Sequence, residues 1–339
     1  MRLSDFEFPF DPALVASQPV SPRDRARLLV LDRATQQYTH RQVTDLSDVL
    51  RPGDLLVLND TRVLAARVPG VKRSTGKPVE VLFVRELEAK RWEIMVKGSF
   101  RVGQVIEFDL DSRVTIVKRD ATGTEAMVES PFPVTRLFDE HGSMPLPPYI
   151  KRAPTQEDRQ WYQTVFARQA GAIAAPTAGL HFTEELFQRL SDLGIKVATV
   201  TLHVGPGTFK PVTVDRIEDH QMGAERFAIS DETVKAIQTT KAAGGRVVAV
   251  GTTVVRTLET VMRENGEMVP ISDESRLFIT PGFQFKVVDA LMTNFHLPKT
   301  TLLMLVSAFA GIEPIRKAYE EAVKERYRFY SYGDAMLIL

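Results

Sequence analysis

The stretch Leu-Leu-Val-Leu-Asn-Asp-Thr-Arg-Val at residues 55–63 decides the fold, because two sequence patterns meet there. Its first four residues are apolar, which is typical of a short strand buried on both faces. Polar residues 59–62 follow at the end of that strand, where open α/β sheets bind their ligands. Beyond residue 63 the pattern changes to many short strands separated by turns. We therefore expect one domain to be interrupted by another at this point.

Residues 61–147 are predicted to form a small antiparallel β-barrel. The expected strands lie at residues 79–84, 92–96, 105–108, 114–117 and 125–128. Turn residues such as Ser-Thr-Gly at 74–76 separate several of them, and three prolines at 145, 147 and 148 mark the end of the segment. Short strands at this spacing favour a closed antiparallel sheet.

The rest of the chain alternates strands with helices. The expected strands lie at residues 28–31, 55–58, 195–204, 246–250 and 277–279, and the expected helices at 156–168, 183–193, 232–243, 253–264 and 302–310. Continuous apolar strands between helices favour a mostly parallel or mixed sheet with helices on both faces. We expect residues 1–60 and 148–339 to form one α/β catalytic domain, into which the barrel of residues 61–147 is inserted.

Composition and charge exclude several classes of protein. Lys plus Arg total 43 and Asp plus Glu total 43, so bulk charge alone does not hold a polyanion. The absence of Cys excludes disulfides, thiolate metal sites and Cys nucleophiles. The longest apolar run, residues 302–312, is shorter than the ~20 residues that span a membrane, and no apolar stretch follows the basic start. We expect a cytoplasmic protein without a membrane partner.

Several familiar signatures are absent from the sequence. Gly70 and Gly76–Lys77 have the wrong spacing for a phosphate-binding loop, and Pro78 stands where Ser or Thr would bind magnesium. These residues favour the tip of a hairpin instead. No G-x-G-x-x-G lies between a strand and a helix, and neither H-E-x-x-H nor G-x-S-x-G occurs. The six His residues are scattered, so no metal site is predicted.

Polar side chains cluster in four loops that follow expected strands. They are Asn59, Asp60 and Arg62; His203, Gly205, Gly207 and Thr208; Thr252 and Thr253, with Arg256 one turn later; and Asn294, Phe295 and His296. Each loop has a structural alternative: an Asx turn, a tight loop around a buried His, a helix cap with Arg256 paired to Glu259, and a capping loop. Two further stretches are ambiguous. The small residues of 171–182 permit close packing or a flat ligand, and the Arg and aromatic residues of 327–334 permit a core or base stacking.

These segments together resemble the S-adenosylmethionine:tRNA ribosyltransferase-isomerase family nearly from end to end. The most specific matches are Ala-Ala-Pro-Thr-Ala-Gly-Leu-His-Phe-Thr at 174–183 and Thr-Leu-His-Val-Gly at 201–205. Leu-Asn-Asp-Thr-Arg-Val at 58–63, Thr-Asn-Phe-His-Leu-Pro at 293–298 and Tyr-Gly-Asp-Ala-Met at 332–336 complete the set. The resemblance implies that the ribosyl part of S-adenosylmethionine is transferred to 7-aminomethyl-7-deazaguanine at the wobble position of tRNA. The sugar is isomerised to give epoxyqueuosine, and adenine and methionine are released.

This chemistry suggests roles for individual residues. The sulfonium acidifies the neighbouring sugar carbon, so a general base is needed there. Because each lies in a family motif and can titrate, His181, His203, His220 and Glu225 are the proton-transfer candidates. The candidates for substrate binding are Asn59, Asp60, Arg62, Thr177, Gly179, Gly205, Gly207, Thr208, Thr252, Thr253, Arg256, Asn294, Phe295 and His296. Among them, the turn at 251–253 together with Arg256 is suited to binding the methionine carboxylate or a phosphate. Candidate RNA contacts are Arg23, Arg27, Arg152 and Arg328.

One departure and two alternatives accompany this interpretation. The family usually has a second His three residues after His220, whereas this chain has Gly223, which transfers no proton. A tRNA-binding barrel protein without chemistry and an S-adenosylmethionine-dependent RNA methyltransferase are the alternatives. The resemblance implies a monomer that acts on a tRNA with a modified wobble guanine. It implies no cofactor, because S-adenosylmethionine is consumed as a substrate.

Overall fold

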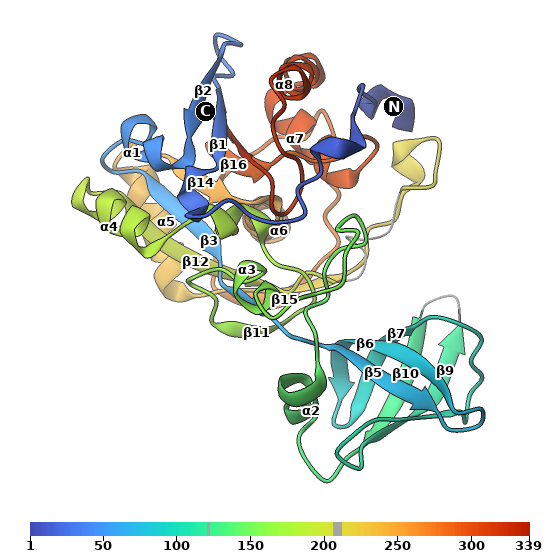
Figure 1. The fold of residues 1–339 in the computed structure, drawn as a ribbon. Helices are drawn as coiled ribbons and strands as arrows, with labels where there is room; N and C mark the ends of the chain where they lie inside the picture. The colour runs from blue at the N-terminus through green and yellow to red at the C-terminus, as the bar shows by residue number, and fades with distance from the viewer. Residues whose placement is uncertain (121–122, 206–211) are drawn as a thin grey trace.

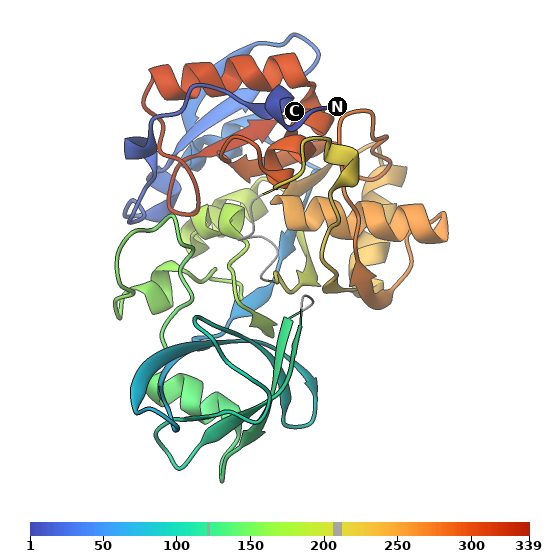
Figure 2. The same cartoon turned by 90° about the vertical axis from the view of Figure 1, so that its right-hand side faces the viewer.

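The computed structural model describes residues 1–120, 123–205 and 212–339, and it contains two folded parts (Figure 1). One is a nine-stranded sheet with helices, and the other is a closed β-barrel. Figure 2 shows the barrel beside the sheet and its helices, joined to them by few segments. No helix among the described residues is long and apolar enough to cross a membrane.

The large sheet is mixed, as the alternating pattern predicts. Its strand order is β15-β13-β12-β3-β14-β16-β17-β1-β2. Strands β12, β3, β14 and β16 run parallel to their neighbours in this group, whereas β13 pairs antiparallel with β12, and β17 antiparallel with β16. The bounds are β1 Arg27–Leu31, β2 Tyr38–Gln42, β3 Leu55–Asn59, β12 Lys196–Leu202, β13 Glu225–Ile229, β14 Val247–Val250, β15 Ile271–Ser275, β16 Ala290–Asn294 and β17 Ala335–Ile338.

Helices cover both faces of this sheet, because its central strands are apolar on both sides. In β3, Leu55 and Val57 join one core cluster, which also contains residues of α5 to α8. Leu56 and Leu58 join a second cluster with residues of α1 and α4. The helices are α1 Leu46–Val49, α2 Val134–His141, α3 Asp158–Trp161, α4 Glu184–Asp192, α5 Asp231–Ala242, α6 Thr252–Asn265, α7 Thr301–Ala310 and α8 Ile312–Lys324. Short 3₁₀ helices are η1 Leu3–Phe6, η2 Pro12–Leu14, η3 Arg23–Arg25, η4 Val43–Asp45, η5 Thr177–His181 and η7 Ile217–Asp219.

The predicted barrel is present and closes in the order β10-β7-β6-β5-β8-β9. Its strands are β5 Arg67–Lys72, β6 Lys77–Glu88, β7 Arg91–Val96, β8 Val105–Glu107, β9 Arg113–Asp120 and β10 Gly123–Glu129. Phe83, Trp92 and Ile106 fill its interior together with Phe138 of α2. At the junction with the large sheet, β4 (Thr61–Val63) pairs in parallel with β11 (Gln169–Ala172). We propose residues 61 and 147 as the bounds of the inserted domain.

Two predicted elements are wrong. The helix expected at residues 156–168 is limited to the four residues of α3, because Gln163 turns to the barrel junction and hydrogen-bonds the backbone of Val63 with both amide atoms. The strand expected at residues 277–279 is irregular, and the edge strand of the sheet is β15 instead. The carbonyl of Leu277 accepts a hydrogen bond from Arg256 (3.1 Å), so a side chain replaces a neighbouring strand there.

Candidate active site

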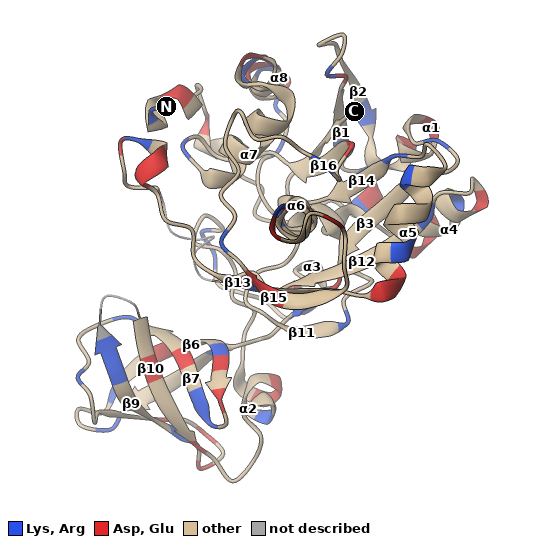
Figure 3. Cartoon of the chain, turned by 180° about the vertical axis from the view of Figure 1, so that it is seen from behind, with Lys and Arg blue, Asp and Glu red and all other residues tan. Residues whose placement is uncertain are grey.

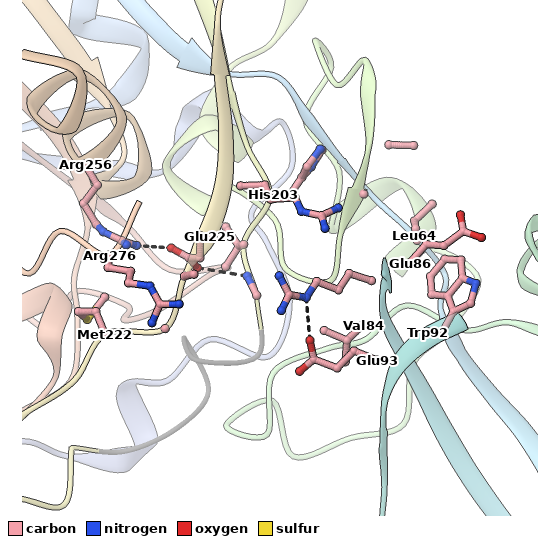
Figure 4. A pocket seen from close by; sticks show the side chains of 18 of the residues that line it. Leu64, Val84, Glu86, Trp92, Glu93, His203, Met222, Glu225, Arg256 and Arg276 are labelled. Atoms are coloured by element: carbon pink, nitrogen blue, oxygen red, sulfur yellow. Dashed lines mark hydrogen bonds and ion pairs between the residues drawn. The ribbon is translucent and has the colours of Figure 1, made fainter. Parts of the chain in front are cut away.

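A cavity of about 1220 Å³ lies between the barrel and the large sheet. Its barrel wall contains Val84, Trp92 and Glu93 of β6 and β7 (Figure 4). Its other wall is built by residues 203–205 after β12, residues 220–226 before and at the start of β13, α6, and residues 276–279. Both folded parts therefore contribute to one site, which neither would form alone.

A buried ion pair lies in the wall formed by the large sheet. Glu225, the first residue of β13, pairs with Nη1 of Arg256 on α6, and each residue is 7% exposed. The second carboxylate oxygen of Glu225 accepts a hydrogen bond from the backbone N–H of Gly205 (3.1 Å). Arg256 also donates from Nε to the carbonyl of Leu277. Its Nη2 is buried and has no hydrogen-bond partner among the described residues. That orphaned donor is suited to an anionic group of a ligand in the cavity.

The pairing of Arg256 excludes the structural alternative of a surface pair with Glu259. Glu259 is buried on α6 and accepts hydrogen bonds from the backbone N–H groups of Lys286, Val287 and Val288 (3.0 Å each). Glu259 therefore anchors a loop, and Arg256 is left to pair with Glu225 at the start of β13. The guanidinium of Arg256 is therefore part of the cavity wall.

His203 is fixed at the cavity by two close neighbours. Its Nδ1 lies 2.8 Å from the hydroxyl oxygen of Thr61, at the ends of the adjacent parallel strands β12 and β3. Burial lowers the pKa of His203, and the nearby Asp60 carboxylate partly opposes that effect. A Cβ added at Gly171 would lie only 2.8 Å from Cε1 of the imidazole, and Gly171 has a φ of +151°. The ring of His203 therefore needs glycine at position 171.

His220 stands on the same cavity wall, close to Glu225 in sequence. Its ring meets Phe278 edge to face, with 5.3 Å between the centroids. Burial lowers the pKa of His220, so the ring is neutral at pH 7 and able to accept a proton. Gly223 lies nearby, and a Cβ there would meet no atom within 4 Å. The cavity therefore has room at the position where the family pattern has its second His.

Two of the predicted histidines, His181 and His296, lie away from this cavity together with Asn294 and Phe295. His181 on η5 is buried, with its Nε2 3.1 Å from the amide nitrogen of Asn294, and burial lowers its pKa to about 4. His296 is also buried, is 2.9 Å from the hydroxyl of Thr293, and has its pKa lowered to about 3 by burial. Phe295 is fully buried among aromatic rings, so it offers no free face to a base. The structure does not bring these groups to His203 and Glu225.

The remaining loop residues build the frame that holds His203. Asn59 bridges strands: its Oδ1 accepts from the backbone N–H of Leu202 (3.0 Å), and its amide donates to the hydroxyl of Thr253 (3.2 Å). Asp60 accepts a hydrogen bond from the hydroxyl of Thr201 (2.7 Å). The other predicted residues of this group do not line the cavity, namely the exposed Arg62, the half-buried Thr177, the buried Gly179 and Thr252 at the start of α6; Gly207 and Thr208 lie outside the described residues.

All four arginines predicted to contact RNA are engaged within the chain. Arg152 holds Asp158 with two hydrogen bonds of 2.6 and 2.7 Å. Arg27 and Arg328 both lie 3.4 Å from Asp334 near the C-terminus. Arg23 donates to the carbonyls of Leu180 and Gln160. These side chains tie the terminal segments together, and their role in RNA binding stays a prediction.

Several cavity residues were missed from the sequence. They include Arg276 and Phe278 after β15, Arg226 on β13, Met222, and Arg85 and Trp92 on the barrel. Arg276 is exposed and has no ion pair among the described residues, and Figure 4 shows it beside Glu225 and Arg256. Nothing in the local pattern marks these positions, because they become a site only when the barrel and the sheet come together.

Comparisons with known proteins agree over the whole chain. A family model described as "Queuosine biosynthesis protein" matches residues 3–338. Proteins of Desulforamulus reducens and Pelobacter propionicus, each named S-adenosylmethionine:tRNA ribosyltransferase-isomerase, are 48% and 49% identical, with both chains covered completely. A Geobacter metallireducens protein of the same name is 48% identical. A crystal structure of S-adenosylmethionine tRNA ribosyltransferase from Thermotoga maritima is 37% identical, with a TM-score of 0.57 and 99% of this chain covered.

Proposed function

The chain belongs to the queuosine biosynthesis family of S-adenosylmethionine:tRNA ribosyltransferase-isomerases, and we propose that the cavity between its barrel and its large sheet is the active site. The enzyme transfers the ribosyl part of S-adenosylmethionine to tRNA and isomerises it. The acceptor that we propose is 7-aminomethyl-7-deazaguanine at the wobble position, and the products are epoxyqueuosine, adenine and methionine. The supporting observation is that one cavity gathers His203, His220 and the Glu225–Arg256 pair.

The size of the cavity supports a site for two substrates. Pockets for single small ligands usually measure about 300–1,000 Å³. The cavity volume of about 1220 Å³ exceeds that range. The cavity therefore has room for a nucleotide of tRNA beside S-adenosylmethionine. A wobble base that leaves its stack could enter from the side of the barrel, where Trp92 stands in the wall.

The two cavity histidines are suited to proton abstraction from the sugar. Burial lowers the pKa of both His203 and His220, so both rings are neutral at pH 7. A neutral imidazole can take the proton from the ribose carbon next to the sulfonium. Of the two, His203 is held more firmly, because Thr61 and Gly171 restrict its ring. We assign the role of general base to His203. His220 is the candidate hydrogen-bond donor to the departing adenine, through the N–H of its neutral ring.

Arg256 is proposed to hold the methionine part of S-adenosylmethionine. Its free Nη2 can donate to the α-carboxylate, and the exposed guanidinium of Arg276 can add a second charge. Glu225 keeps Arg256 in place and lies where it can attract the α-ammonium group. The proposed reaction requires no covalent attachment of the substrate to the protein. We also propose that S-adenosylmethionine is consumed without a further cofactor.

The decisive experiment identifies the products. The protein is incubated with S-adenosylmethionine and a tRNA that carries the deazaguanine, and the small molecules are separated. Free adenine and methionine in equal amounts are expected. S-adenosylhomocysteine would show methyl transfer instead, and the absence of all three products would leave only the RNA-binding alternative. We also propose that the protein is cytoplasmic. We propose in addition that it acts as a monomer, because the walls of the cavity come from one chain. Sedimentation of the active protein as a dimer would contradict the proposal of a monomer.

A further inference from the structure

The outer end of the barrel carries a group of basic residues around one aromatic ring, which we call the Phe100 patch. Its members are Lys72, Lys77, Lys97, Arg101 and Arg119, which come from the β5–β6 hairpin, the turn after β7, and β9. Figure 3 shows blue segments on β9 and on neighbouring turns of the barrel. Lys77, Lys97, Arg101 and Arg119 are exposed, and Lys72 is half-buried. The patch therefore presents five positive charges to solvent.

The patch is ordered by contacts within the barrel. The ammonium group of Lys72 lies 4.6 Å from the centre of the Phe100 ring and donates to the carbonyl of Ser99 (3.1 Å). The guanidinium of Arg119 lies 5.9 Å from the same ring and donates to the carbonyl of Gly98 (3.0 Å). Phe100 itself is 7% exposed and anchors the turn in the barrel core. These contacts fix the positions of two cations without neutralising either.

Charge on the patch is not balanced by acidic side chains. No ion pair joins any of its five members to a carboxylate among the described residues, whereas Arg67, Arg85 and Arg113 elsewhere on the barrel each pair with a Glu. Lys72 and Lys77 are direct cross-strand partners in the β5–β6 hairpin. Like charges in that arrangement destabilise a hairpin. An unpaired group of cations of this kind is suited to a polyanion.

We propose that the Phe100 patch binds the phosphate backbone of the tRNA substrate. The identity of this polyanion rests on the proposed function. The position of the patch supports it: strand β7 places Trp92 in the cavity wall and runs directly to Lys97, five residues later. At a strand rise of about 3.4 Å per residue, this separation is ~17 Å. An RNA stem with one base in the cavity can therefore lay its backbone across the patch. Phosphate contacts there position the RNA, and the cavity selects the base.

The test compares salt-dependent RNA binding by two double variants of the full-length protein. The probe is an anticodon stem-loop RNA that carries the deazaguanine at the wobble position, and Kd is measured by fluorescence anisotropy from 50 to 300 mM salt. Lys97→Ala with Arg101→Ala is expected to raise Kd about tenfold at low salt. It should reduce the slope of log K against log salt by about 2, because each lost phosphate contact removes about one unit.

A matched control also removes one Lys and one Arg, but from a part of the molecule away from the barrel. Arg263→Ala with Lys317→Ala changes exposed residues of α6 and α8, and it should leave both Kd and slope unchanged. The patch variant should keep wild-type kcat at saturating RNA and wild-type KM for S-adenosylmethionine, because no patch residue lines the cavity. An unchanged Kd and slope in the patch variant would overturn the proposal. If the wild-type protein released no adenine, the proposed function would fail, yet the binding comparison would still decide the role of the patch.

Discussion

The change Gly171→Ala adds one methyl group against the proposed general base. The new Cβ would lie 2.8 Å from Cε1 and 3.0 Å from both ring nitrogens of His203. Contacts under 3.0 Å require something to move, and the backbone of Gly171 has a φ of +151°, which an L residue rarely adopts. The His203 ring is expected to rotate away, and it would then lose its contact with Thr61.

The magnitudes separate a structural effect from a catalytic one. A non-glycine residue at such a φ costs about 1–3 kcal/mol, and the lost hydrogen bond costs about 0.5–1.5 kcal/mol. In a chain of this size the melting temperature should fall by only a few degrees. A positioned general base contributes about 10²–10⁴-fold to a rate. The rate of adenine release should therefore fall by about 100-fold or more, while the affinity for S-adenosylmethionine, held by Arg256, stays near the wild-type value.

The assay measures adenine release in single turnover, together with thermal unfolding. Gly223→Ala is the matched control, because it adds the same methyl group to the same cavity where no atom lies within 4 Å. It should retain wild-type rate and melting temperature. If Gly171→Ala released adenine as fast as Gly223→Ala, His203 would not be the base, or its ring would not need its present orientation.

Three further predictions concern the site and the buried histidines. Glu225→Gln leaves the buried charge of Arg256 unpaired, so the free energy of unfolding in urea should fall by about 3–5 kcal/mol. Adding Arg256→Met to this variant should recover part of that loss. If the double variant recovered no stability, the loss would not come from an unpaired Arg256. Thr61→Val removes the hydroxyl partner of His203, so kcat should fall and its acidic pH limb should move, with KM for S-adenosylmethionine unchanged; an unaltered pH profile would show that Thr61 does not position the ring. The pKa values of His181 and His296, about 4 and about 3, lie below the value of 6.5 in the unfolded chain. Below pH 6.5 the unfolded state therefore binds more protons, so the contribution of these rings to the free energy of unfolding should be full above pH 6.5 and decline as the pH falls towards 4. A constant free energy of unfolding between pH 7 and 4.5 would contradict this.

Local sequence patterns predicted the elements that depend on their own residues. The apolar run of β3 is confirmed, and the helices expected at residues 183–193 and 302–310 are present as α4 and α7. Both helices begin at a local cap: the Thr183 hydroxyl accepts from the backbone N–H of Leu186, and the Thr300 hydroxyl from that of Leu303. Strand β5 was missed, because Pro69 and Gly70 within it are residues that strands usually exclude. Barrel closure supplies its pairing with β6 and β8 despite those residues.

The sequence by itself determined the family and the mixed sheet with an inserted barrel, and it named His203, His220 and Glu225 among the candidates for proton transfer. These features follow from the periodicity of neighbouring residues and from motifs that lie within short segments. Only the tertiary structure decided which of the candidate groups share a cavity. Strands β3 and β12 end side by side and bring Thr61 to His203, whereas η5 places His181 in a separate buried network.

The choice of partner for Arg256 shows the physical reason most clearly. In the sequence, Glu259 lies three residues from Arg256, and a pair on the helix surface is one of the two alternatives. In the fold, Glu259 satisfies three backbone N–H groups, and Arg256 turns to Glu225, 31 residues distant in the chain. A buried charge takes the partner that the whole packing arrangement leaves available, and spacing along one helix carries no information about that arrangement.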